Sequence, residues 1–87
     1  MLNTMSAAVS MSETEVLQWL TELFEEKPGA LNPQTAREDI PTWDSLGVLN
    51  LMAGLDEKFG IVLSEQELQS MLRVDDILKV LRQHGKL

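Results

Sequence analysis

Hydrophobic positions recur at helical spacing in three separate stretches of the chain. The clearest stretch lies in the middle, where apolar side chains follow one another at intervals of three or four residues and form one face: Val48, Leu51, Met52, Leu55 and Phe59. Similar stripes occur nearer to both ends. We therefore predict amphipathic helices over residues 13–26, 45–59 and 74–84.

Two capping signals support this pattern. Ser12 and Glu15 fit a capping box, in which a serine and a glutamate three residues later satisfy each other's backbone N–H groups. Ser64 and Glu67 repeat the arrangement and predict a further, short helix over 65–71.

The segment between the first two predicted helices has a different character. Residues 27–43 contain three prolines and one glycine without a sustained apolar period, which indicates a long loop. Leu31, Ile40 and Trp43 are its expected anchors in the core. The chain is thus predicted to be an all-α protein, a small four-helix bundle with a long loop after its first helix. We expect a flexible tail over 1–11 and one domain over 12–87.

The start of the predicted second helix carries the most distinctive chemistry. Asp44 can cap the helix, because its carboxylate can accept a bond from a first-turn N–H group. Ser45 then lies in the first turn, where the helix dipole attracts anions and backbone donors would meet a phosphate on the hydroxyl. Asp44 also offers an oxygen ligand for the magnesium ion of a modifying enzyme. Gly60 can supply the left-handed residue that ends the helix.

A second apolar line follows the same helix. Leu46, Leu49 and Ala53 lie on a flank that the core of a four-helix bundle would not fully cover. They can form a docking face, or they can pack under the long loop, and the pattern favours neither. Asp56 and Glu57 are polar groups beside this line.

Composition narrows the classes of function. The formal charge of −7, from 14 acidic and 7 basic residues, argues against binding to nucleic acid or anionic membranes and favours a partner with a basic face. The chain has no cysteine and one histidine, so we expect no disulfide and no metal site. No apolar run is long enough for membrane insertion and no secretory signal is evident, so a cytoplasmic location is expected.

An enzyme is not expected from this sequence. Ser45 could act as a nucleophile beside a base, but the only histidine, His84, falls at the end of the last predicted helix. The sequence around Ser45 lacks the Gly-x-Ser-x-Gly turn of serine hydrolases.

The tripeptide Asp44-Ser45-Leu46 resembles the attachment motif of acyl carrier proteins, and the similarity extends from about residue 12 to residue 85. Residues 55–60, Leu-Asp-Glu-Lys-Phe-Gly, are similar to the family's Leu-Glu-Glu-x-Phe-Gly, and residues 73–77 resemble its lead-in to the last helix. Trp43 before the motif resembles a bacterial subgroup with Trp-Asp-Ser-Leu.

The resemblance implies that Ser45 carries 4′-phosphopantetheine, transferred from coenzyme A by a magnesium-dependent phosphopantetheinyl transferase. Residues 12–87 would then be a carrier domain, expected as a monomer, that holds an acyl group as a thioester. An acyl-loading ligase or synthase would charge it, and separate acyl-processing enzymes would receive the cargo. The family's partner-binding positions correspond to Leu46, Leu49, Ala53, Asp56 and Glu57.

Several residues depart from the family's pattern. Gly47 and Asn50 stand where the family often has an acidic residue and a glutamate. Ala53-Gly54 stands where Met-Ala is common, and Arg73 stands where a serine or threonine cap is usual. The two glycines are expected to loosen the helix or to let a partner approach closely. A less acidic second helix favours a specialised lipid or secondary-metabolite pathway. An aminoacyl, peptidyl or D-alanyl carrier and an unmodified helical scaffold are the alternatives.

Overall fold

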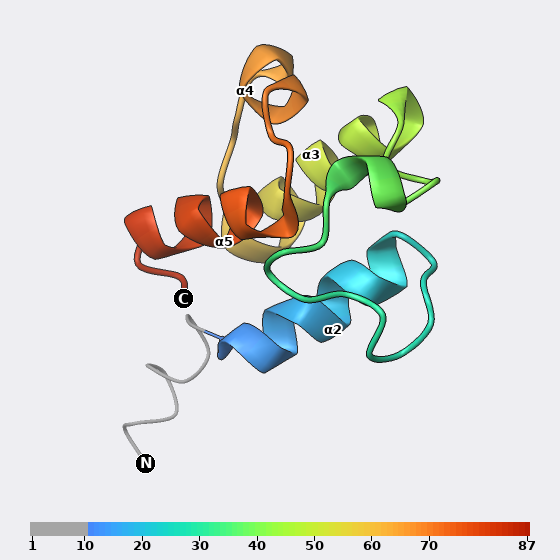
Figure 1. Cartoon of the computed structure of the whole chain (residues 1–87). Helices are drawn as coiled ribbons and strands as arrows, with labels where there is room; N and C mark the ends of the chain where they lie inside the picture. The colour runs from blue at the N-terminus through green and yellow to red at the C-terminus, as the bar shows by residue number, and fades with distance from the viewer. Residues whose placement is uncertain (1–10) are drawn as a thin grey trace.

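The computed structural model describes residues 11–87, which contain four α-helices and one 3-10 turn joined by loops (Figure 1). No strand occurs in these residues, and the predicted all-α fold is confirmed. Residues 1–10 of the expected tail lie outside the described part. The elements in chain order are α2 (Glu13–Leu23), η1 (Arg37–Asp39), α3 (Ser45–Phe59), α4 (Glu65–Gln69) and α5 (Val74–Gln83).

The first helix ends three residues earlier than predicted, at Leu23 instead of residue 26. The N–H of Glu25 donates to the carbonyl of Glu22, and the N–H of Glu26 donates to that of Thr21, which together form a Schellman motif. Glu25 occupies the left-handed position of this motif, with φ of 56°. Glycine usually stands at such a position, and the first glycine of the chain is Gly29, so the sequence pattern placed the end of the helix too late.

The other helix boundaries agree closely with the sequence pattern. Helix α3 has the predicted bounds and ends at Gly60, whose φ of 69° is left-handed as expected. Both predicted capping boxes are present, at Ser12 with Glu15 and at Ser64 with Glu67. Helices α4 and α5 end at Gln69 and Gln83, slightly before the predicted residues 71 and 84.

The core is built mainly from aliphatic side chains of α2, α3 and α5, with two aromatic pairs added. Phe24 stacks on Trp43 at a centroid distance of 5.1 Å, and Trp19 meets Phe59 edge-on at 5.3 Å. The predicted anchors of the long loop are all buried: Leu31, Ile40 and Trp43. The loop therefore closes one side of the core.

The long loop also runs beside the linker between α4 and α5. The N–H of Arg37 donates to the carbonyl of Leu72 at 2.8 Å, and the N–H of Val74 donates to that of Thr35 at 3.0 Å. These bonds frame an isolated antiparallel bridge between residues 36 and 73. Segments far apart in sequence, green and orange in Figure 1, are thereby held together.

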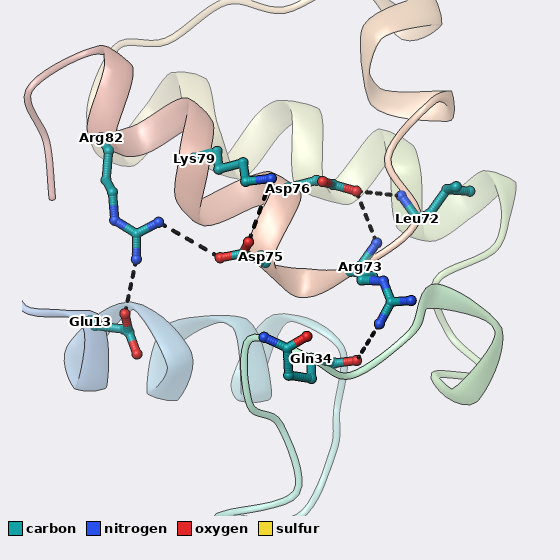
Figure 2. Close-up of polar contacts among 8 residues, drawn as sticks. All are labelled: Glu13, Gln34, Leu72, Arg73, Asp75, Asp76, Lys79 and Arg82. Carbon is teal, nitrogen blue, oxygen red and sulfur yellow. Dashed lines mark hydrogen bonds and ion pairs between the residues drawn. The ribbon is translucent and has the colours of Figure 1, made fainter.

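Helix α5 begins without a serine or threonine cap. The carboxylate of Asp76 instead accepts the N–H groups of Leu72 and Arg73, at 2.8 and 3.1 Å (Figure 2). Figure 2 also shows Arg82 of α5 reaching Glu13 of α2 at 3.0 Å. Such an exposed ion pair contributes little to stability, so the caps and the core account for the position of α5.

The second capping box makes a prediction about pH. The N–H and the hydroxyl of Ser64 lower the pKa of the Glu67 carboxyl. The contribution of this box to stability is therefore present above the ordinary glutamate pKa and is lost as the pH falls through the lowered value. Ser64→Ala is expected to raise the pKa of Glu67 part of the way, because the backbone donor remains. Carboxyl-detected NMR titration measures this change; Ser12→Ala is the control, and an unmoved Glu67 pKa in Ser64→Ala would contradict the explanation.

Candidate functional site

Ser45 is the first residue of α3 and its side chain is exposed. Asp44 precedes it as the N-cap, and its Oδ1 atom accepts the N–H groups of Leu46 at 3.1 Å and Gly47 at 3.0 Å. The predicted cap is therefore confirmed. The hydroxyl lies at the positive end of a 15-residue helix, where a macromolecule can reach it.

The cap also corrects one expectation. A phosphate on Ser45 was expected to meet free backbone donors, but Asp44 already uses the N–H groups of Leu46 and Gly47. The N–H of Val48 bonds to the carbonyl of Asp44 at 2.9 Å. The helix end thus presents an accessible hydroxyl in a favourable dipole field, but those donors are not available to bind a phosphate.

Tertiary contacts hold the two residues that precede Asp44. The hydroxyl of Thr42 donates to the carbonyl of Phe24 at 2.6 Å, which ties this segment to the end of α2. The Nε of Arg37 donates to the carbonyl of Trp43 at 3.0 Å, and its Nη atoms donate to two oxygens of Gln69 at 3.2 Å. Arg37 therefore links the approach to Ser45 with the end of α4. The sequence offered no signal for this role, because an arginine in an irregular loop matches no motif.

The two glycines of α3 serve close packing within the chain. A Cβ on Gly47 would lie 2.0 Å from the carbonyl oxygen of Thr42. A Cβ on Gly54 would lie 2.9 Å from the indole of Trp19 and 3.0 Å from a methyl group of Leu23. The sequence suggested that these glycines loosen the helix or let a partner approach closely. In the structure, the segments that approach them are the long loop and α2 of the same chain.

The second apolar line of α3 faces outward. Leu46 is 65% exposed and Leu49 is 50% exposed, and Ala53 is exposed as well. Packing under the long loop, the alternative left open by the pattern, is therefore wrong for this line. Asp56 and Glu57 are exposed further along the helix. We refer to these five residues as the α3 patch.

The inner face of α3 differs from the prediction at one position. Val48, Leu51, Leu55 and Phe59 are buried as expected, whereas Met52 is only half-buried. Met52 thus borders the core instead of lying within it.

Other chemical features are few in the described residues. His84 is exposed, and its Nδ1 lies 2.9 Å from the carbonyl oxygen of Val80. Within residues 11–87 no three histidine or acidic side chains gather in a way that would bind a metal ion. None of the helices over the same residues is long and apolar enough to cross a membrane.

Comparison with known proteins adds no family. No protein-family model matches the chain, and no curated protein is significantly similar to it. The function is therefore inferred from the hydroxyl of Ser45, its helix and the exposed residues around it.

Proposed function

We propose that the chain is an acyl carrier protein in which Ser45 is the attachment point of 4′-phosphopantetheine. The observation that carries this proposal is the exposed Ser45 hydroxyl, within the Asp-Ser-Leu sequence, at the start of a long, capped helix whose inner face is buried. A swinging arm needs a rigid base and an accessible anchor, and this position offers both.

The attachment reaction fits the residues present. The Ser45 oxygen forms a bond to the phosphorus that bears pantetheine in coenzyme A, the serine proton is lost, and adenosine 3′,5′-bisphosphate leaves. Both capping bonds use Oδ1 of Asp44, so Oδ2 is not committed to the cap and can ligate the transferase's magnesium ion. The bound arm supplies the thiol for a thioester, which the cysteine-free chain lacks.

The α3 patch is the proposed docking surface for the transferase, the loading ligase or synthase and the acyl-processing enzymes. Leu46, Leu49 and Ala53 offer exposed apolar contact next to the anchor, and Asp56 and Glu57 offer negative charge. The net charge of −7 would speed association with a basic partner face. We propose that the protein itself is a cytoplasmic monomer without catalytic activity.

Leu49→Glu tests the docking surface. Because Leu49 is half-exposed on α3, the substitution should change the free energy of unfolding by no more than about 0.5 kcal/mol. Loss of an interfacial apolar contact should reduce kcat/KM for the attachment of phosphopantetheine by the transferase about tenfold, as measured by intact mass over time. Val62→Glu is the matched control, because Val62 is 77% exposed beyond the far end of α3. Equal loading by Leu49→Glu and the wild type would remove Leu49 from the interface.

Intact mass spectrometry tests the proposal as a whole. The folded chain, incubated with a broad-specificity phosphopantetheinyl transferase, coenzyme A and magnesium, should gain the mass of one phosphopantetheine group. A folded chain that gains nothing would favour an unmodified helical scaffold.

Loading enzymes separate the remaining alternatives. Aminoacyl, peptidyl and D-alanyl carriers use the same type of anchor, so a panel of ligases supplied with the modified chain identifies the cargo class. We propose an acyl cargo of a specialised lipid or secondary-metabolite pathway, since Gly47 and Asn50 make α3 less acidic than usual in the family.

A further inference from the structure

A cleft of about 550 Å³ lies between the long loop and the linker from α4 to α5. Its walls include apolar parts of the loop and the linker together with two arginines: Arg37, Ile40, Pro41, Trp43, Leu72 and Arg73. The volume is in the range of small-molecule sites. The backbone bonds between residues 35–37 and 72–74 hold its two walls together.

The cleft begins close to Ser45. Trp43, one of its walls, precedes Ser45 by two residues, a separation of at most about 7 Å along an extended chain. Arg37 holds the carbonyl of Trp43 directly. An arm attached to Ser45 therefore starts close to Trp43, a residue of the cleft lining, although Ser45 itself does not line the cleft.

The two arginines give the cleft an unusual charge for so acidic a chain. Neither has a carboxylate oxygen within 4 Å in residues 11–87, and residues 1–10 contain no acidic residue. Arg37 bonds only to neutral oxygens, and Arg73 makes one long bond of 3.5 Å to the carbonyl of Gln34 (Figure 2). Among the other bases of residues 11–87, Lys79 and Arg82 are paired with acidic side chains, whereas Lys27, Lys58 and Lys86 are also without an ion pair. Glu38 borders the cleft without pairing with either arginine.

Trp43, a residue of the cleft lining, also carries an unpaired polar group. The indole N–H of Trp43 is buried and has no hydrogen-bond partner among the described residues. An unpaired buried donor is costly, so the indole N–H resonance is a sensitive reporter of any change in the packing of this wall.

We propose that this cleft holds the terminal carboxylate of a cargo carried on the arm, so that the preferred cargo is the half-thioester of a dicarboxylic acid. This inference rests on the proposed carrier function. Apolar walls suit a methylene chain, and a guanidinium suits the carboxylate at its end. The phosphodiester of the arm is the other anion available, but it is also present in the form without cargo, so its effect on the cleft can be separated from that of the cargo.

Three modified forms of the protein distinguish a terminal carboxylate, an apolar chain and the phosphodiester as possible occupants of the cleft. A transferase that accepts acyl-coenzyme A is supplied with coenzyme A, pentanoyl-coenzyme A or glutaryl-coenzyme A, and intact mass confirms each product. Amide, Trp43 indole and arginine Nε resonances are then compared by NMR. Glutaryl alone should shift the signals of Trp43 and Arg73, and added salt should reduce the shift because the ion pair is partly exposed.

Charge-matched variants complete the test. Arg73→Gln should reduce the glutaryl-specific shift about fivefold, whereas Lys79→Gln, which removes the same charge from a residue outside the cleft, should leave it unchanged. Equal shifts with pentanoyl would indicate apolar packing, and equal shifts without cargo would indicate the phosphodiester; either result overturns the proposal. A correctly loaded protein with an unperturbed cleft also overturns it and leaves the carrier function intact. Absence of any mass gain would refute both.

Discussion

Ser45→Ala is expected to abolish the gain of phosphopantetheine while the helical fold is retained. The substitution removes one exposed oxygen, and without it no bond to phosphorus can form at this position. The Asp44 cap bonds to Leu46 and Gly47 and does not depend on the serine hydroxyl. The free energy of unfolding should therefore change by no more than about 0.5 kcal/mol. Intact mass after reaction with transferase and coenzyme A measures the modification, and thermal melting followed by circular dichroism measures the stability.

Ser64→Ala is the matched control. Ser64 is likewise an exposed serine at the start of a helix, but it caps α4 and lies outside the Asp-Ser-Leu sequence. This variant should accept one phosphopantetheine group as the wild type does. Modification of Ser45→Ala would place the anchor elsewhere, and loss of modification in Ser64→Ala would show that a helix-capping serine is needed for reasons other than attachment.

Gly47→Ala is expected to lower the free energy of unfolding by about 2 kcal/mol or more. The new methyl group would lie 2.0 Å from the carbonyl oxygen of Thr42, so the first turn of α3 or the loop has to move. The loop cannot yield freely, because Thr42 is bonded to Phe24 and Trp43 is buried. Overpacking typically costs about 1–3 kcal/mol, and here the obstacle is backbone, which outweighs the gain of up to about 1 kcal/mol in helix propensity.

Gly54→Ala provides the comparison for this effect. Its methyl group would meet the side chains of Trp19 and Leu23 at 2.9 and 3.0 Å, and side chains can move more easily than a backbone carbonyl. We expect a loss of no more than about 1 kcal/mol, since the helix-propensity gain offsets part of the contact. Denaturant unfolding measures both variants. Equal stability of Gly47→Ala and the wild type would mean that the loop before Ser45 is not held where the structure shows it.

Local signals predicted most of the helical structure. The periodicity of α3, the Ser12 and Ser64 boxes and the Asp44 cap act over three or four residues, so they could be read from the sequence. The end of α2 was mispredicted because Glu25 takes the left-handed position that usually requires glycine. That ending accompanies the inward position of Phe24, which stacks on Trp43 from a distant part of the chain.

At the candidate site, too, local features could be predicted from the sequence, whereas features that depend on distant contacts could not. The tripeptide and the helical pattern predict an accessible Ser45 beside a capping Asp44, but they do not decide the exposure of Leu46 and Leu49, which depends on the path of the long loop. Arg37 was not predicted at all, because its role depends on Trp43 and Gln69 being brought together.

By itself, the sequence determined where the helices begin, which face of α3 enters the core and that a serine stands at the tip of that helix. Only the tertiary structure decided that Gly47 makes room for the Thr42 carbonyl and that Arg37 and Arg73 share one cleft. The physical reason is the separation along the sequence over which each kind of interaction acts. Caps and periodicity depend on neighbours within a turn or two, whereas the shared cleft depends on bonds between residues 35–37 and residues 72–74, which lie 35 to 39 positions apart in the sequence.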